Sequence, residues 1–204
     1  MLNVITPSPA AWDAFVASHP RAHVLQQSAW GDLKAAYGWG VERVALAQGD
    51  QLVAGAQLLF RALPFRLGTM AYLPMGGYVT DDAQWGELWR AVDACAKRHR
   101  AAFLKWEAGI YRADSPPDFP RFGFQPGVQT VQPPNTILID ISGDDDAILA
   151  RMNQGTRRKI RQSAKNDVRY FEGSRADVAK FTAMMQTTGS RNAFGVHESA
   201  YYQL

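Results

Sequence analysis

The sequence contains a single cysteine, Cys95, and no long run of uncharged apolar residues. One cysteine excludes an internal disulfide and a cysteine-rich metal site, and the four histidines are scattered without ligand spacing. No segment is apolar over the length that crosses a bilayer, and residues 1–20 lack the continuous apolar core of a signal peptide. We therefore expect a cytoplasmic protein without a metal site or a transmembrane segment, in which Cys95 is a core residue of a helix.

Patterns that supply a catalytic nucleophile are also missing. No arrangement is typical of a Ser-His-Asp triad or of an activated thiol. Glycine-bearing turns follow predicted strands at residues 74–78 and 125–127, and neither has the glycine-rich, basic pattern that cradles a pyrophosphate. Any transfer chemistry would therefore rest on positioning a substrate that is already activated.

The residues that are present are those of a soluble globular protein with a sizeable core, since 47% of the 204 residues are hydrophobic and 20% are charged. Charge is unevenly distributed along the chain. Residues 1–150 contain twelve Lys or Arg and fifteen Asp or Glu, whereas residues 151–204 contain ten and four. This asymmetry favours two parts, which we place at residues 1–141 and 142–204.

Local patterns predict alternating helices and strands in the first part. Ser8-Pro9 opens a helix, Ser28 caps a second one, and Gly49-Asp50 is a strong hairpin signal. An amphipathic helix is predicted at residues 83–99. The predicted strands are residues 41–48, 51–60, 67–73, 102–106 and 136–141. This order favours the α/β class, a mixed sheet flanked by helices.

Residues 141–169 are predicted to form one helix, capped by Ser142, that is acidic where it begins and basic where it ends. Its buried stripe would consist of Ile148, Met152, Thr156 and Ile160. Residues 151–175 contain eight Lys or Arg against two acids, more than a helix dipole requires. Two interpretations stay open: a solvated basic face, or an anion-binding surface for phosphate or nucleic acid.

After this helix, residues 168–172 alternate like a strand, and Ser174 with Asp177 forms a capping box that opens another helix. One strand between two helices cannot bury both faces of a sheet. We therefore expect a truncated product or fragment, with one complete or near-complete domain and the beginning of a second, incomplete one.

Several short motifs occur in order along most of the chain. They are QQSAW at residues 26–30 followed by Lys34, YLPMGG at 72–77, FLKWE at 103–107 and PNTILID at 134–140. The longest is MNQGTRRKIRQSAKNDV at 152–168, which is followed by SRNAFG at 190–195, His197 and Tyr201-Tyr202. In this order and spacing the sequence resembles the FemABX family, the non-ribosomal peptidyltransferases that build peptidoglycan cross-bridges.

The resemblance implies two tandem domains of the GNAT-like acyltransferase fold. It implies transfer of an amino acid from aminoacyl-tRNA, a co-substrate that needs no further cofactor, to the side-chain amine of a peptidoglycan precursor, either lipid II or UDP-MurNAc-pentapeptide. Such a protein is cytoplasmic and could associate peripherally with the inner membrane face. The family's key lysine of the second domain would lie beyond Leu204, so this chain alone would not be a complete enzyme.

The resemblance also carries roles to individual positions. Lys34 matches a lysine that contacts the precursor's diphosphate, and a snorkelling surface lysine is the alternative. His197 falls where a relative has an arginine for the same diphosphate, and this departure weakens the site. Tyr201 matches a tyrosine of that pocket, although a core role is equally open. Arg191 could bind a phosphate or brace its loop.

Glu107 lies at a strand end where the family has a carboxylate near the peptide. It could act as a general base for the attacking amine, and an ion pair with Lys105 or Arg112 is the alternative. In the basic helix, the residues predicted to bind tRNA phosphates are Arg157, Arg158, Arg161 and Lys165.

Two other functions remain open from the sequence. One is an ordinary GNAT N-acyltransferase that uses acyl-CoA, against which the missing pyrophosphate loop argues. The other is a non-catalytic module that only binds tRNA or a cell-wall precursor.

Overall fold

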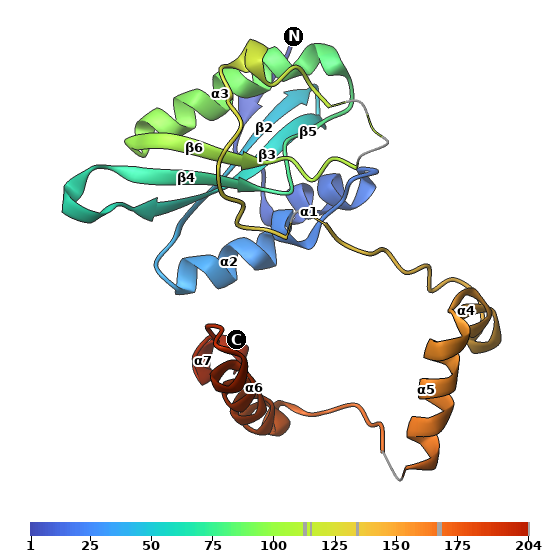
Figure 1. The fold of residues 1–204 in the computed structure, drawn as a ribbon. Coiled ribbons are helices and arrows are strands. Elements are labelled where there is room, and N and C mark those ends of the chain that lie inside the picture. Colours follow the sequence, from blue (N-terminus) through green and yellow to red (C-terminus); the bar gives the residue numbers. More distant parts are fainter. Residues whose placement is uncertain (112–113, 115, 134, 167–168, 204) are drawn as a thin grey trace. The chain divides into compact units, whose positions relative to one another are not determined.

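The computed structural model describes residues 1–111, 114, 116–133, 135–166 and 169–203. The chain divides into two compact units, Met1–Pro134 and Asn135–Leu204 (Figure 1). The predicted division into two domains at 141/142 stays a prediction.

The first unit is built on one mixed sheet. Within the described residues its strands are β1 (Asn3–Ile5), β2 (Gly40–Gln48), β3 (Gln51–Ala62), β4 (Thr69–Pro74), β5 (Tyr78–Val79) and β6 (Ala101–Glu107). Their order is β1-β2-β3-β4-β6, and β5 pairs with β3. β4 and β6 are parallel, whereas the other pairs are antiparallel. The predicted hairpin at Gly49-Asp50 joins β2 to β3, and Gly49 takes a φ of +60° there.

Helices cover both faces of this sheet (Figure 1). On one face, α3 (Trp85–Arg98) packs against alternate residues of β3, as predicted for residues 83–99. Its buried residues include Trp85, Leu88, Trp89, Val92 and Cys95. On the other face, α1 (Pro9–Ser18) approaches so closely that a Cβ at Gly55 would lie 2.6 Å from the Trp12 ring. The predicted α/β class, a mixed sheet flanked by helices, is confirmed.

α2 (Ser28–Ala36) begins differently from the prediction. Its cap is Gln27, whose side chain makes no capping bond, and Ser28 is the first helical residue. The N–H of Ser28 donates to Asp13 Oδ1 at 2.6 Å, and its hydroxyl donates to the other oxygen of the same carboxylate. Because the hydroxyl is used to attach α2 to α1, it does not cap its own helix.

A buried glutamine joins two of the sequence motifs. The side chain of Gln26 donates to the carbonyls of Gln57 at 3.1 Å and Pro74 at 2.8 Å, and its oxygen accepts the N–H of Gln57 at 2.8 Å. A Cβ at Gly76 would lie 2.3 Å from the amide carbon of Gln26. The motifs at residues 26–30 and 72–77 therefore meet in one buried hydrogen-bond network.

The regular elements of the second unit, where it is described, are all helices. They are α4 (Asp145–Arg151), α5 (Gln154–Lys165), α6 (Val178–Asn192) and α7 (Ser199–Gln203). The prediction of one continuous helix at residues 141–169 is wrong, because the chain is extended at Met152, with ψ at 152°. Asn153 then caps α5 by accepting the N–H of Thr156 at 2.9 Å. Asp144, rather than Ser142, caps α4. A second strong capping residue inside the predicted helix explains the break.

The buried stripe predicted for this segment is wrong too, since neither α4 nor α5 contains a buried residue and Ile160 is 41% exposed. The strands predicted at residues 136–141 and 168–172 are also not formed in the described residues; Val168 lies outside them. Ile137 is 86% exposed, as a strand-type sequence without a pairing partner would be. The predicted capping box is confirmed: Ser174 N–H donates to Asp177 Oδ2 at 2.9 Å before α6.

Candidate functional site

Glu107 ends β6, beside the end of the parallel strand β4. Its Oε2 accepts the Tyr72 hydroxyl at 2.5 Å and the N–H of Gln132 at 3.1 Å, while Oε1 accepts the N–H of Val131 at 2.5 Å. The carboxylate therefore fastens the chain at residues 131–132 to the end of the sheet. Burial, and the hydrogen bond donated to Glu107, raise the pKa of Tyr72 above its ordinary value, so the phenol stays a donor.

These contacts bear on both predicted roles of Glu107. A carboxylate has about four acceptor positions, and three are occupied, which leaves one for a substrate proton. The predicted ion pair with Lys105 is not formed, because the Lys105 ammonium donates to the carbonyl of Gln129. The other predicted partner, Arg112, lies outside the described residues. The general-base role of Glu107 stays a prediction.

An apolar cavity of about 610 Å³ opens beside β6, with Glu107 and Lys105 among its lining residues. Its walls include Phe119 and Phe124, whose rings lie 4.8 Å and 5.1 Å from that of Trp106 between centroids. An apolar hollow with a few polar groups at one side is the usual form of a ligand site. The lining comes entirely from the first unit.

Lys34 lies in the last turn of α2, four residues after Trp30 on the same helix. Its Nζ lies 4.5 Å from the centroid of the Trp30 ring, in a cation–π contact. This contact holds the ammonium on the helix surface. Contact with a diphosphate stays a prediction.

The second unit brings two of the predicted site residues together. The rings of His197 and Tyr201 stack with centroids 3.8 Å apart and planes at 14°. Arg191 is exposed in the last turn of α6, which ends at Ala193 in a left-handed conformation. Because Lys34 belongs to the first unit and His197 to the second, their shared contact with one diphosphate stays a prediction.

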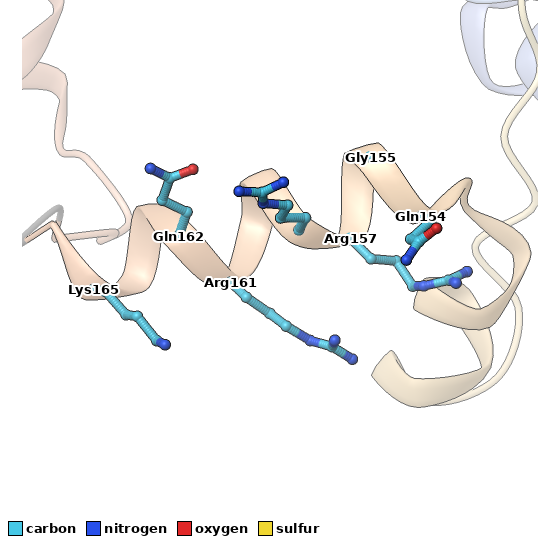
Figure 2. A pocket seen from close by; sticks show the side chains of 7 residues that line it. Gln154, Gly155, Arg157, Arg161, Gln162 and Lys165 are labelled. Carbon is cyan, nitrogen blue, oxygen red and sulfur yellow. The ribbon is translucent and has the colours of Figure 1, made fainter.

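The four predicted tRNA-binding residues lie on α5, where their side chains line an open hollow of about 820 Å³ (Figure 2). Arg157 also donates to the Met152 carbonyl at 2.5 Å, at the end of α4. Among the described residues, Arg158, Arg161 and Lys165 have no acidic partner. Five cations on one solvent-facing helix with no acid of its own form a surface suited to anions.

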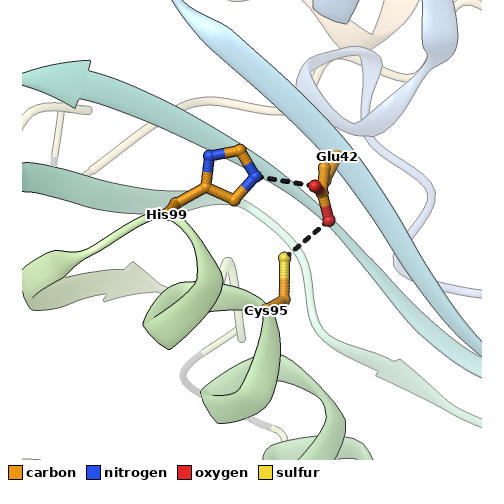
Figure 3. Close-up of side chains that lie close together, drawn as sticks. All are labelled: Glu42, Cys95 and His99. Atoms are coloured by element: carbon orange, nitrogen blue, oxygen red, sulfur yellow. Dashed lines mark hydrogen bonds and ion pairs between the residues drawn. The ribbon is translucent and has the colours of Figure 1, made fainter.

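Sequence reasoning missed one cluster, formed by Glu42 on β2 with Cys95 and His99 of α3 and its cap (Figure 3). His99 Nε2 lies 2.6 Å from Glu42 Oε1, and Cys95 Sγ donates to Oε2 at 3.0 Å. The expectation that no histidine has ligand spacing is therefore wrong for His99, four residues after Cys95. Among the described residues this is the one group of three side chains able to share a metal ion.

The electrostatics of this cluster favour an ionised Glu42. Burial acts to raise its pKa, but hydrogen bonds from Cys95, His99 and Arg98 outweigh burial and hold the pKa below its ordinary value. Burial, then the hydrogen bond to Glu42, raises the pKa of Cys95 to about 12, so the thiol is protonated and unreactive. Cys95 is fully buried, as predicted for a core residue.

The fold, a mixed sheet covered on both faces by helices, is one that this chain shares with a family of known proteins. The chain matches the FemAB family over residues 8–112 and 122–204 and belongs to that family. It is 29% identical to a lipid II:glycine glycyltransferase of Staphylococcus saprophyticus over 95% of this chain and 49% of that protein. The corresponding protein of Staphylococcus aureus is 28% identical over 94% of this chain and 48% of its own length.

The chain thus spans about half the length of the curated relatives it matches. A solved structure, the crystal structure of FemX, superposes with a TM-score of 0.81 over 98% of this chain and 53% of that one, at 24% identity. This likeness confirms the predicted fold class. No helix in the described part of the chain is long and apolar enough to cross a membrane.

Proposed function

We propose that the protein is an aminoacyltransferase of peptidoglycan cross-bridge formation. It moves an amino acid from aminoacyl-tRNA to the side-chain amine of a peptidoglycan precursor, lipid II or its UDP-linked form, on the cytoplasmic side of the membrane. The observation that carries the proposal is the similarity of 94–95% of the chain to proteins named lipid II:glycine glycyltransferase.

Each substrate has a proposed set of partners in the chain. Lys34 binds the diphosphate of the precursor through its charge. The stacked pair His197 and Tyr201 binds the precursor as well, and Arg191 binds a phosphate. The cations of α5 bind the phosphate backbone of tRNA, a polyanion that such a surface attracts before any specific contact is made.

The chemistry asks little of the protein because an aminoacyl ester is already activated. The amine nitrogen forms a bond to the carbonyl carbon, the ester bond to the ribose oxygen breaks, and the proton lost by the amine ends on that oxygen. Holding the amine and the ester together provides most of the acceleration. Glu107 is the proposed general base, which takes the amine proton at its one open acceptor position.

A binding titration with UDP-MurNAc-pentapeptide tests the precursor site. We expect saturable binding by the wild-type chain and a loss of about tenfold or more for Lys34→Ala, since one charge-assisted phosphate contact is removed. The matched control is Lys97→Ala, because Lys97 is an exposed helix lysine whose ammonium pairs with Asp93 at 2.6 Å. Equal affinities of the two variants would contradict the assigned role of Lys34.

The reaction itself is followed by mass spectrometry of the precursor after incubation with charged tRNA. A mass increase of one amino-acid residue supports the proposal. Precursor binding without transfer, by a chain extended to the length of its relatives, would reduce the protein to a binding module. Saturable binding of acetyl-CoA without precursor binding would favour an acyl-CoA-dependent acyltransferase instead.

A further inference from the structure

The connection between β3 and β4 is an apolar, basic tip at one end of the sheet. It comprises residues 63–68, Leu-Pro-Phe-Arg-Leu-Gly, within a stretch from 51 to 80 that contains no acidic residue. The N–H of Leu63 donates to the Gly68 carbonyl at 2.9 Å and closes the loop. In Figure 1 this connection projects past the ends of α2 and α3.

The loop holds its large apolar side chains out of the core. Phe65 is 93% exposed and Leu67 is 66% exposed. Phe65 and Arg66 both have positive φ, 56° and 59°, a conformation that residues with a side chain rarely adopt. Two large hydrophobic residues exposed on either side of Arg66, on a backbone of this kind, call for a functional explanation.

Arginines surround the tip. Arg61 lies just before it on β3 and Arg66 within it, and both are exposed. The turn before β6 adds exposed Arg100, whose carbonyl accepts the N–H of Thr69 at 3.0 Å and so fixes that turn beside the loop. The nearby acid Glu42 is already engaged by Arg98 at 2.9 Å. The tip is therefore apolar at its end and positively charged around its base.

We propose that residues 63–68 are a membrane contact, with Phe65 and Leu67 inserted among the headgroups of an anionic bilayer and the arginines at lipid phosphates. Charge complementarity favours this occupant, because basic side chains next to an anionic leaflet and apolar side chains at the interface act together. A folded protein partner requires several hundred Å² of matching surface, whereas a convex tip with two apolar side chains offers far less. The role of this membrane contact rests on the proposed function, since a lipid-linked acceptor is reached only at the bilayer.

Vesicle co-sedimentation tests the contact, without tRNA or precursor, so that its result is independent of transfer activity. We expect the protein to partition onto vesicles of phosphatidylcholine with about 30% phosphatidylglycerol, and weakly onto phosphatidylcholine alone. The double variant Phe65→Ser/Leu67→Ser should lose about tenfold or more in partitioning, and Arg66→Gln about fivefold. Matched controls are Val128→Ser, since Val128 is fully exposed elsewhere, and Arg90→Gln, since Arg90 is 73% exposed on α3.

Insertion is checked by an environment-sensitive dye on Leu67→Cys, with Val128→Cys as the control; native Cys95 is fully buried. A blue shift on anionic vesicles only for the label at position 67 supports the proposal.

Vesicle binding that is unchanged in the Phe65→Ser/Leu67→Ser variant would overturn the proposal, because only general charge attraction would then explain the binding. A dimer in solution that this variant dissociates, without any vesicle binding, would also overturn it and make the tip a self-association surface. Transfer activity that is absent despite normal tip insertion would count against the proposed function alone.

Discussion

Glu42 receives hydrogen bonds from Cys95, His99 and Arg98, and this cluster attaches the end of α3 to β2. Sequence reasoning missed this cluster, although the four-residue spacing of Cys95 and His99 on one predicted helix was a local signal that could have found part of it. The position of Glu42 depends on the pairing of β2 with β3. A lone acid in a strand carries no signal of its partners, because they are more than fifty residues away in the chain.

Replacing Glu42 by Gln should lower the free energy of unfolding by about 1 kcal/mol at pH 7, since charge-assisted hydrogen bonds are lost. Because the folded-state pKa is depressed, the contribution of Glu42 is present above the ordinary value of 4.5 and is lost as the pH falls below it. Urea denaturation of both proteins from pH 7 to 3 measures this, and the two curves should converge at low pH. Glu87→Gln is the control, because Glu87 pairs with Arg90 at the helix surface. A constant difference at every pH would contradict the assignment.

Replacing glycine by alanine should have opposite effects on stability at Gly76 and at Gly86. Gly76→Ala places a methyl group against the buried Gln26 network and should destabilise the protein by about 1–3 kcal/mol. Gly86 lies in α3, where a methyl group would meet no other atom within 4 Å, so Gly86→Ala should stabilise by up to about 1 kcal/mol. The melting temperatures of the two variants measure these effects. A shift of the same sign in both variants would contradict the close packing of Gly76 against Gln26.

Among the secondary-structure elements, the ones read correctly from sequence are those whose signals are local. The hairpin at Gly49-Asp50 and the first helix, whose cap Ser8 accepts the N–H of Ala11 at 3.3 Å, need only neighbouring residues. Residues 136–141 have strand-type composition but need a pairing partner, which composition cannot supply. The segment at 141–169 failed for a different reason, because the capping residue Asn153 interrupts a pattern that otherwise reads as helical.

In the candidate site, too, the features that could be predicted are those with local signals in the sequence. The strand end at Glu107 was predictable, but its donors Val131 and Gln132 follow a loop that no periodicity places. The charge of α5 was fully readable from sequence, since it depends only on which residues the helix contains.

For α5 we expect the triple variant Arg158→Ala/Arg161→Ala/Lys165→Ala to bind tRNA more weakly and with less salt dependence. Each lost phosphate contact lowers the slope of log K against log salt by roughly 0.7–0.9, so the slope should fall by about 2. Filter binding at several salt concentrations measures it. Lys180→Ala is the control, since Lys180 is 82% exposed on another helix and pairs with Asp177. An unchanged slope would instead support the interpretation of α5 as a solvated basic face.

Across the whole molecule, burial is concentrated in the first unit. In the part of the chain that the structure describes, every buried apolar side chain lies between Pro7 and Cys95. α5 has twelve residues and buries none of them. Isolated helices of that length are marginal in water, so most of the folding free energy should come from the sheet and the helices packed on it.

Rates of amide hydrogen exchange should therefore differ between the first unit and α5. Amides at the centre of β3, near Leu58 and Leu59, should open only with global unfolding, whereas those of α5 should exchange with little protection. Mass spectrometry of peptides after a time series in D2O measures both in one sample. Adding tRNA should slow exchange in α5 and leave β3 unchanged, because only the helix gains a partner, and the α5 triple variant should abolish that slowing. Strong protection of α5 in the free protein would mean that the helix already packs against something, and its cations would then need a structural explanation.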